Sequence, residues 1–305
     1  MSTVYATIAA KLRMAGTGAL YEPELRQLAE QFIAYKQSEG GIFGDIASLH
    51  CRMFGGDEQL ADTGAAAVEL MILALDIYDD LQDKDNNKVP WSQIDPAIAL
   101  NVAIGLQSLS LDLVLTASGP TDRKMMAATY LNQGVLRAVN GQHTDLRNEP
   151  MTEEECLQMI EDKSGSLVAA ACLVGAALAT DEHAELIGAY GRAMGGAAQL
   201  RNDVEGMQRW DTRNDLLARK QTLPIQYVLE QQSEEAALVR SYYDGEISQD
   251  KLLERKHEIM DYVNGCGSVE YGLIHAKLKQ YEAEAGINQL PVDEVWKEKL
   301  RAFAQ

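Results

Sequence analysis

Apolar residues recur at intervals of three and four along most of the chain, the spacing that gives an α-helix one buried face. The helices expected from this pattern cover residues 61–83, 95–116, 122–140, 153–160, 182–205, 223–232, 234–243, 249–264, 269–285 and 292–304, and a buried apolar helix follows Ser166. Turn-forming residues separate them at 86–90, 119–120, 148–150 and 286–291. Thr152, with a capping box to Glu155, and Asp181 are expected N-caps. Without repeats or long linkers, the pattern predicts an all-α protein in which residues 1–305 form a single-domain helical bundle.

The charge of the chain narrows the range of possible partners. Only 7 prolines occur in 305 residues, which suits long helices. Lys and Arg number 27 against 46 Asp and Glu, so the formal net charge is −19. A field this negative repels nucleic acid and anionic lipid, and neither is an expected partner. If the ligand is itself an anion, cations must mediate its binding.

The cysteines and the apolar runs indicate a cytoplasmic protein. The four cysteines, at positions 51, 156, 172 and 266, form no CxxC pair and are expected to be reduced, mostly buried thiols rather than zinc ligands or disulfides. The longest apolar run, residues 167–179, is shorter than the ~20 residues that a membrane-spanning helix needs. The N-terminus lacks a signal-peptide pattern, so neither secretion nor a membrane span is expected.

The segment DIYDDLQDKDN places four aspartates, Asp76, Asp79, Asp80 and Asp83, on one face of a helix. At ~6 Å each like-charged pair costs roughly 2–3 kcal/mol, and the negative end of the helix dipole adds to the repulsion. A solvated acidic face is the simplest alternative, but the apolar, core-like helix that leads into the cluster disfavours it. Hard divalent cations prefer such oxygen ligands, so the sequence predicts a Mg²⁺ site here.

A second polar segment could form the opposite side of this metal site. Asn202 and Asp203 lie at the expected end of an apolar helix, with Glu205 on the solvent side. Alone, such a pair is more often a helix cap, but carboxylates on facing helices of a bundle can share a metal. Lys163 and Lys220 lie in expected turns between apolar helices. Single lysines are usually surface residues, yet two beside an acidic metal site could bind phosphate oxygens.

These segments, in this order, resemble the trans-isoprenyl diphosphate synthase superfamily. Asp79, Asp80 and Asp83 match its DDxxD motif, which we call the first motif. The other matches are GQxxD at Gly141, Gln142 and Asp145, Lys163 with Ser164, the FQxxDD block at Gln199, Asn202 and Asp203, and the DLxxGKxTLP block at Asp215, Leu216, Lys220, Thr222, Leu223 and Pro224. The matches extend over most of the chain.

The resemblance implies the class I isoprenoid synthase fold, a helical bundle around a deep apolar cavity, in a homodimer that uses Mg²⁺. It implies roles for four groups of residues: catalytic Asp79, Asp80 and Asp83; metal ligands Asp79, Asp83, Asn202 and Asp203; diphosphate-binding Lys163, Gln199 and Lys220; and Ala74, Leu75 and Gln142 along the isoprenoid tunnel.

The chain also departs from the superfamily, mostly on the side of the acceptor. Residues 40–43 read GGIF, without the two basic residues of the GGKR-type loop that binds isopentenyl diphosphate. Ile72 replaces an acceptor-binding His or Gln, and the RRG that normally follows the first motif is absent. The second motif keeps Asp203 but has Asn202 and Gly206 in place of two aspartates. The donor half of the site therefore survives in part, whereas the acceptor diphosphate pocket is lost.

One branch of the superfamily fits these departures: the ComQ-type isoprenyltransferases, which modify a tryptophan of a quorum-sensing pheromone precursor. This resemblance implies Mg²⁺-dependent ionisation of geranyl or farnesyl diphosphate and transfer of the isoprenyl group to such a peptide. The alternatives are a short-chain polyprenyl diphosphate synthase, a terpene cyclase and an inactive subunit of a hetero-oligomeric synthase. The second metal motif of a terpene cyclase continues with a hydroxyl residue and a glutamate, whose places here are taken by Gly206 and Trp210, which do not fit. His143 could be a base near the acceptor or, more commonly, a hydrogen-bonded helix residue.

Overall fold

A computed structural model describes residues 7–8, 19–84, 86–210 and 214–304. The regular elements in these ranges are helical, as the sequence predicts. In chain order they are α2 (Pro23–Glu39), α3 (Ile42–Met53), α4 (Glu58–Asp83), η1 (Pro90–Gln93), α5 (Pro96–Leu115), α6 (Thr121–Arg147), α7 (Glu153–Ile160), η2 (Glu161–Gly165), α8 (Ser166–Ala179), α9 (Ala184–Gln208), α10 (Leu223–Glu230), α11 (Glu234–Tyr243), α12 (Gln249–Leu253), α13 (Lys256–Gly265), α14 (Ser268–Gln289) and α15 (Glu294–Phe303). The N-terminal residues, on which the expectation of no signal peptide depends, lie almost wholly outside the described ranges.

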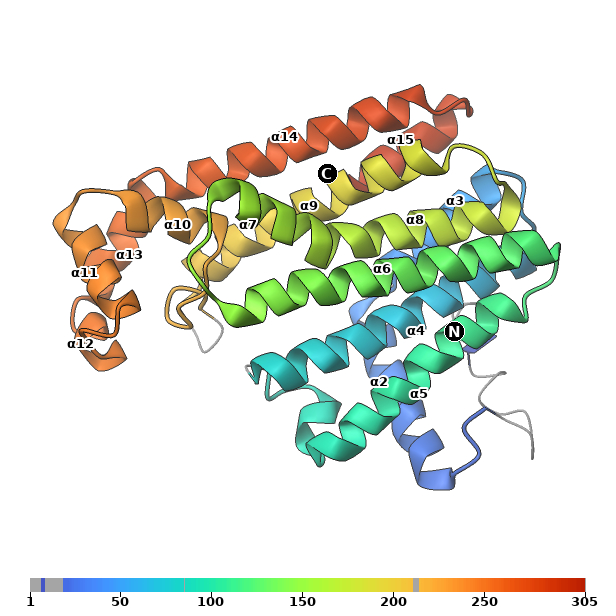
Figure 1. The fold of residues 1–305 in the computed structure, drawn as a ribbon, viewed down its shortest axis with the longest axis horizontal. Helices are drawn as coiled ribbons and strands as arrows, with labels where there is room; N and C mark the ends of the chain where they lie inside the picture. The colour runs from blue at the N-terminus through green and yellow to red at the C-terminus, as the bar shows by residue number, and fades with distance from the viewer. Residues whose placement is uncertain (1–6, 9–18, 85, 211–213, 305) are drawn as a thin grey trace.

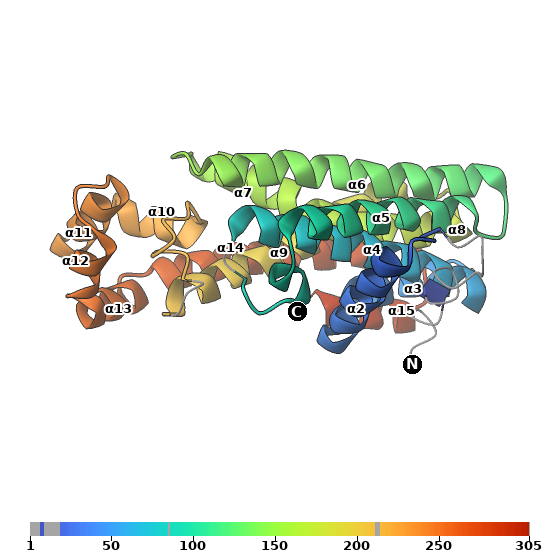
Figure 2. The ribbon, with the colours of Figure 1, turned by 90° about the horizontal axis from the view of Figure 1, so that it is seen from below.

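The long helices pack side by side into a bundle (Figure 1). α4 contacts α3, α5, α6 and α8, while α8 packs against α3, α6 and α9, and α14 lies along α9. Two views place α11, α12 and α13 together at one end of the molecule (Figures 1 and 2). With the end of α9 and with α10 they surround a second apolar cluster, which includes Val239, Leu252 and Ile259. The single-domain organisation of the chain stays a prediction.

The helix boundaries differ from expectation at several places. The capping box of Thr152 with Glu155 at α7 is confirmed. The expected cap at Asp181 is wrong, because His183, with a φ of 63°, precedes α9. The periodicity predicted no helix before residue 61 and so missed α2 and α3, and the segment 249–264 is divided into α12 and α13. Gly286 lies inside α14 rather than in a turn.

Two helices reach further towards one end of the bundle than the sequence suggests. α6 continues to Arg147 instead of residue 140, and α9 continues to Gln208 instead of residue 205. Gly141, which follows the expected end of this helix, lies inside α6, where a Cβ would be 2.3 Å from the backbone nitrogen of Lys163. The glycine thus allows α6 and η2 to touch. The GQxxD segment and the second motif therefore lie within helices.

The most apolar helices and most of the cysteines are packed within the bundle. Two helical stretches, Pro96–Leu115 and Glu153–Ala179, are long and apolar enough to cross a membrane by length and composition alone. The first packs along α4, and the second, which includes η2, contacts α3, α6 and α9. The bundle buries most of the second stretch but less than half of the first, whose remaining apolar side chains stay exposed. All four cysteines are free thiols and three of them are buried, as predicted.

Candidate active site

The first motif lies at the C-terminal end of α4, where its carboxylates meet two lysines. Asp83 Oδ2 accepts a hydrogen bond from Lys220 Nζ at 2.7 Å, and Asp79 Oδ1 lies 3.4 Å from Lys163 Nζ. The sequence predicts that a metal relieves the repulsion among the clustered aspartates. In this structure the two ammonium groups relieve part of it, because each lies beside one carboxylate of the first motif.

The other two aspartates of the cluster have different partners. Asp76 Oδ2 lies 2.7 Å from Lys36 Nζ on α2. Asp80 Oδ2 accepts a hydrogen bond at 2.7 Å from Nε1 of Trp91, whose buried ring packs edge-on against Phe32. Asp80 therefore joins α4 to η1 and lines neither of the two cavities described below. Its catalytic role stays a prediction.

Lys163 lies on η2, a π-helical turn between α7 and α8. Its Nζ is 2.6 Å from Asp145 Oδ2 as well as near Asp79. Burial alone would lower the pKa of Lys163, but the carboxylates of Asp79 and Asp145 outweigh it and raise that pKa. Lys163 is therefore a fixed cation at neutral pH. π-helical turns inside α-helices are frequent at functional sites.

Lys220 is positioned by the segment between α9 and α10 and by α11. The hydroxyl of Tyr243 donates to the carbonyl oxygen of Lys220 at 2.9 Å, and that of Tyr242 donates to the carbonyl of Leu217 at 2.6 Å. The side chain of Asn214 accepts the Leu217 N–H at 2.7 Å. No sequence signal identified the two tyrosines, because they follow their partners by 23 and 25 residues.

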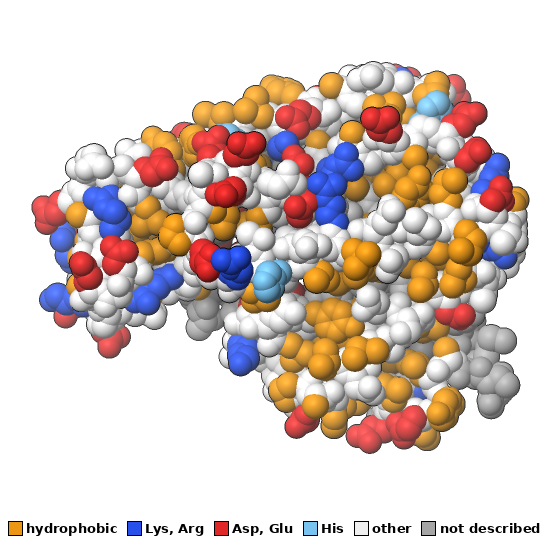
Figure 3. Space-filling view, in the orientation of Figure 1, with side chains coloured by type: hydrophobic (Ala, Val, Ile, Leu, Met, Phe, Trp, Pro, Cys, Tyr) orange, Lys and Arg blue, Asp and Glu red, His pale blue; other side chains and the backbone are white. Residues whose placement is uncertain are grey.

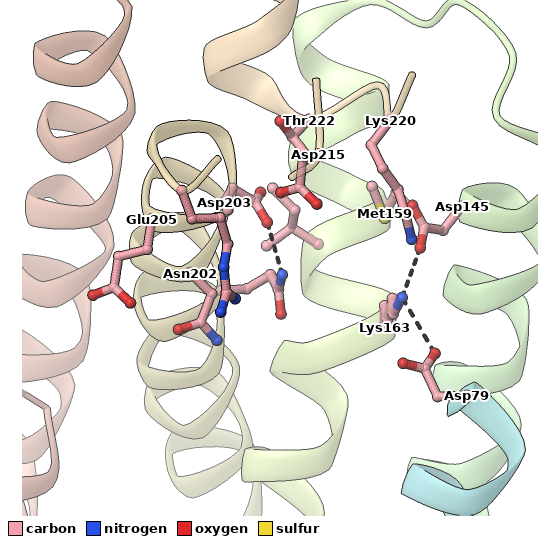
Figure 4. A pocket seen from close by; sticks show the side chains of 14 residues that line it. Asp79, Asp145, Met159, Lys163, Asn202, Asp203, Glu205, Asp215, Lys220 and Thr222 are labelled. Atoms are coloured by element: carbon pink, nitrogen blue, oxygen red, sulfur yellow. Dashed lines mark hydrogen bonds and ion pairs between the residues drawn. The ribbon is translucent and has the colours of Figure 1, made fainter. Parts of the chain in front are cut away.

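The second motif contributes one buried carboxylate. Asp203 is 5% exposed, and its Oδ1 accepts a hydrogen bond from Gln199 Nε2 at 2.7 Å. Gln199 Oε1 in turn accepts from the hydroxyl of Ser164 at 2.7 Å. Burial raises the pKa of Asp203 to about 7. Asn202 and Glu205 are exposed, and Figure 4 shows the side chain of Glu205 pointing away from the lysines, as predicted.

Asp203→Asn is expected to stabilise the metal-free protein, and more so at higher pH. Because the folded state raises the pKa of this carboxyl above its unfolded value of 3.8, stability is lost as pH rises towards about 7. An asparagine pays no such ionisation cost and still accepts the Gln199 hydrogen bond. The advantage of the variant in unfolding free energy should therefore grow by about 2 kcal/mol between pH 5.5 and 8. Denaturant unfolding at both pH values measures it, and an advantage that does not change with pH would argue against a raised pKa.

Two cavities meet at the end of the bundle where these residues gather. The charged cavity, about 360 Å³, is lined by Asp79, Asp145, Met159, Ile160, Lys163, Gln199, Asn202, Asp203, Glu205, Gly206, Arg209, Asp215, Lys220 and Thr222. The apolar cavity, about 350 Å³, has walls that include Phe43, Leu75, Tyr78, Val139 and Leu167. Asp79, Lys163, Gln199 and Asn202 line both cavities. The pair therefore suits a ligand with an anionic head and a hydrocarbon tail.

The predicted tunnel residues are only partly brought together. Leu75 lines the apolar cavity, and so does Gln142, which donates to Gln82 Oε1 at 3.1 Å. The Oε1 atom of Gln142 is buried without a partner. Ala74 is buried in the core and does not line this cavity, because its neighbour on α4, Leu75, faces the cavity instead.

The residues around the charged cavity fit Mg²⁺ by their chemistry. Carboxylates reach it from α4, through Asp79, and from α9 and the loop after it, through Asp203 and Asp215 (Figure 4). Within the part of the chain that the structure describes, no three Asp, Glu, His or Cys side chains converge closely enough to hold a metal ion. An ion here would have to share its coordination with ligand oxygens, as Mg²⁺ commonly does with phosphates. The buried, unpartnered hydroxyl of Thr222 is a further polar atom without a protein partner in this cavity.

The surroundings of the GGIF segment differ from those of a diphosphate pocket. α3 begins at Ile42, which is 55% exposed, and the N–H of Gly44 in its first turn donates to Glu69 Oε1 at 2.5 Å. Burial raises the pKa of Glu69 to about 7. Lys36, on the neighbouring α2, is paired with Asp76. A carboxyl group thus already occupies the helix N-terminus, a position that often binds anions.

Comparison with known proteins gives consistent likenesses in sequence and in fold. The sequence model of the polyprenyl synthetase family matches residues 28–261. The chain is 34% identical over 231 residues to the tryptophan prenyltransferase ComQ of Bacillus spizizenii, with 76% of this chain and 81% of that one covered. It is 29% identical over 286 residues to the tryptophan prenyltransferase ComQ of Bacillus subtilis (strain 168), with 92% of each chain covered.

The fold likeness extends over nearly the whole chain. The polyprenyl synthase from Caulobacter crescentus CB15, solved in complex with calcium and isoprenyl diphosphate, superposes with a TM-score of 0.82 at 21% identity. The superposition covers 99% of this chain and 92% of that one. It confirms the all-α fold that the sequence predicts.

Proposed function

Because the chain belongs to the polyprenyl synthetase family and is a prenyltransferase, we propose that its donor is geranyl or farnesyl diphosphate. The acceptor is a tryptophan of a peptide precursor of a quorum-sensing pheromone, and the reaction depends on Mg²⁺. The observation that carries this proposal is the junction of the charged and apolar cavities at Asp79, Lys163 and Gln199. A diphosphate fits on one side of this junction and an isoprenyl chain on the other.

The charged cavity offers partners for each part of a metal-bound diphosphate. Asp79 and Asp203, with the amide oxygen of Asn202, line this cavity and would hold the metal ions. Asp83 does not line the cavity itself but is bonded to Lys220, which does, and would join them as a ligand. When bound, Mg²⁺ would neutralise the charge that develops on the leaving diphosphate. The ammonium groups of Lys163 and Lys220 now pair with carboxylates and would turn to phosphate oxygens instead. The metal ions would then neutralise the carboxylates of Asp79 and Asp83 that the lysines release.

The apolar cavity would protect the allylic cation formed on ionisation. Leu75, Val139 and Leu167 line it, and such side chains neither attack the cation nor hold water near it. In the transfer, the carbon–oxygen bond of the donor breaks with its electron pair on the diphosphate. The indole ring then forms the new bond to the cation and loses a proton.

The residues around the GGIF segment, where family members bind the acceptor, favour a peptide acceptor over a second diphosphate. Glu69 already accepts from the N-terminus of α3, and Lys36 is neutralised by Asp76. Burying a second diphosphate beside these carboxyl groups would be costly, whereas an uncharged indole meets no such penalty. The two Bacillus relatives described above, which match 76% and 92% of this chain, are named tryptophan prenyltransferases.

Pyrophosphate release tests whether the donor ionises. With Mg²⁺ and a tryptophan-containing peptide, geranyl diphosphate should release pyrophosphate, and a saturated analogue without the allylic double bond should react orders of magnitude more slowly. Only the allylic donor can delocalise the positive charge. Equal rates for the two compounds would indicate attack at phosphorus and would refute ionisation.

We also infer that the chain forms a homodimer through α5 and α6. Large apolar side chains are exposed on both helices, among them Ile98, Ile104, Met125 and Leu136. Figure 3 shows hydrophobic side chains gathered over these helices, and a contiguous patch of this kind usually marks an interface. Sedimentation velocity should give a dimer for the wild type and for the control Leu273→Asp on α14, and a monomer for Leu136→Asp. A monomeric wild type would contradict the inference.

A further inference from the structure

An indole that attacks the allylic cation must give up a proton, and the apolar cavity offers few groups that can take it. Of the described residues that line this cavity, only Asp76 and Asp79 carry carboxylates, and none is a histidine. Asp79 also lines the charged cavity, where a bound metal ion would remove its basicity. His143, the candidate base from the sequence, is exposed and lines neither cavity. Asp76 is therefore the base that remains.

The amide of Gln142 is a second acceptor in this cavity, but it is not a second base. Within the described part of the chain, its Oε1 atom is buried without a partner and could accept a hydrogen bond from an N–H group. An amide oxygen is a far weaker base than a carboxylate and takes up no proton at neutral pH. Gln142 could therefore help to orient an indole without completing the reaction.

Asp76 lies on the side of the apolar cavity where α2 and α3 meet α4. Its Oδ2 atom is 2.7 Å from Nζ of Lys36 on α2. Phe43, in the first turn of α3, lines the same cavity. Aromatic rings pack favourably against one another in offset and edge-on arrangements. This side of the cavity thus offers an aromatic wall and a carboxylate, which together suit a flat ring with an N–H donor.

The ion pair with Lys36 holds Asp76 in place and still allows it to take up a proton. Burial raises the pKa of Asp76, although the charge of Lys36 opposes this effect, so the carboxylate is more basic than that of an ordinary aspartate. Lys36 Nζ also lies 3.8 Å from Glu39 Oε2. When Asp76 is protonated, the ammonium group of Lys36 therefore keeps a carboxylate nearby.

We propose that Asp76 accepts a hydrogen bond from the indole N–H and takes its proton once the new carbon–carbon bond has formed. This inference rests on the proposed function, because it names a catalytic residue for that transfer. A ring carbon of the indole gives a pair of π electrons to the allylic cation, and the positive charge passes to the ring and its nitrogen. The N–H proton then moves to Asp76, the electrons of that bond neutralise the ring, and Asp76 later releases the proton to water.

Loss of this base should change where the isoprenyl group goes rather than whether the donor ionises. Until the ring loses its proton, the new bond can break again, and water can capture the cation as an alcohol. In Asp76→Asn, with geranyl diphosphate, Mg²⁺ and a tryptophan peptide, the ratio of prenylated peptide to isoprenyl alcohol should fall about a hundredfold. Pyrophosphate release should continue, because the diphosphate binds in the other cavity. Asp76→Glu, which restores a carboxylate, should recover part of the ratio.

Two controls separate loss of the base from a change in the ion pair or in the fold. Glu39→Gln removes the other carboxylate beside Lys36 but does not alter the lining of the cavity, so it should keep the ratio of the wild type. Asn at position 76 keeps the shape of the side chain and can still accept from Lys36. Magnesium pyrophosphate should therefore raise the melting temperature of Asp76→Asn as it does that of the wild type.

A peptide whose tryptophan carries a methyl group on the ring nitrogen shows whether Asp76 acts through the N–H. The wild type should modify this peptide far less than the tryptophan peptide, whereas Asp76→Asn should modify the two equally little. A purely steric effect of the methyl group would instead persist in the variant and would contradict the proposed hydrogen bond.

The remaining outcomes distinguish the inference from the proposed function. If Asp76→Asn keeps the product ratio of the wild type, the departing diphosphate takes the proton, and the role of Asp76 is overturned while the proposed function stands. If Asp76→Asn is folded but no longer releases pyrophosphate, Asp76 belongs to the diphosphate site and the inference is also wrong. A wild type that ionises the donor but modifies no peptide would overturn the proposed acceptor and the inference with it.

Discussion

Asp79→Asn and Asp83→Asn should each reduce turnover of geranyl or farnesyl diphosphate by about 1,000-fold, because each removes a carboxylate that we propose as a metal ligand. The two carboxylates lie one helical turn apart on α4 and face Lys163 and Lys220. Asparagine keeps the shape of the side chain but cannot neutralise a metal ion. Loss of either charge should therefore affect catalysis far more than the fold.

The fold of these variants should persist for a reason visible in the ion pairs. Burial raises the pKa of Asp79, so its charge is costly to the metal-free protein. Lys163 keeps Asp145 as a partner when Asp79 is neutral. Asp62→Asn, on the same helix but with its carboxylate 3.9 Å from Arg52, is a matched control that should keep its turnover.

Steady-state turnover and thermal melts separate the two effects. Magnesium with pyrophosphate should raise the melting temperature of the wild type and of Asp62→Asn, and not that of Asp79→Asn. If Asp79→Asn or Asp83→Asn keeps more than about a tenth of the activity, the first motif does not hold the metal as proposed.

Local spacing was sufficient to predict the first motif and its place. The i, i+3, i+4 pattern of Asp76, Asp79, Asp80 and Asp83 puts the four on one side of α4, where the structure has them. It could not tell which neighbour each would meet, because Lys36 and Trp91 approach from other elements. Tertiary packing therefore decides that Asp79 and Asp83 meet the two lysines of the site, whereas Asp76 and Asp80 bind Lys36 and Trp91.

Two glycines allow close packing that the sequence pattern does not predict. The expected helix ended before Gly141, yet this glycine lies inside α6, allows α6 to touch η2 and brings Asp145 to Lys163. Gly206 lacks the carboxylate of the second motif, as the sequence indicates, and its missing side chain also leaves room for Asp215. Each of these close contacts depends on a second segment of the chain, and the periodicity of apolar residues does not predict which segments will meet.

The supports of Lys220 were equally invisible in the sequence. The hydroxyl of Tyr243, on α11, donates to the Lys220 carbonyl, and the apolar cluster that includes Val239, Leu252 and Ile259 packs against this tyrosine. The sequence motif identified the lysine, but only the fold shows that helices at one end of the molecule position it.

Isopentenyl diphosphate is expected to be a poor acceptor, with elongation at least about a hundredfold slower than transfer to tryptophan, a difference of about 2.7 kcal/mol in activation free energy. Its diphosphate would have to bind where Glu69 meets the first turn of α3 and where Lys36 is paired with Asp76. The exposed side chain of Ile42 offers no charge in place of a basic residue. A chain with a net charge of −19 would repel this second anion further.

The most direct measurement puts both acceptors in one reaction. The enzyme, Mg²⁺ and farnesyl diphosphate are mixed with equal concentrations of isopentenyl diphosphate and a peptide that carries a single tryptophan near its C-terminus. A matched peptide with phenylalanine at that position serves as the control. Mass spectrometry of the peptides and chromatography of the dephosphorylated lipids then show where the isoprenyl group has gone. We predict a tryptophan peptide heavier by one isoprenyl group, an unchanged phenylalanine peptide and almost no elongated prenyl alcohol. Abundant elongated alcohol with an unmodified tryptophan peptide would contradict the account and identify an ordinary prenyl diphosphate synthase.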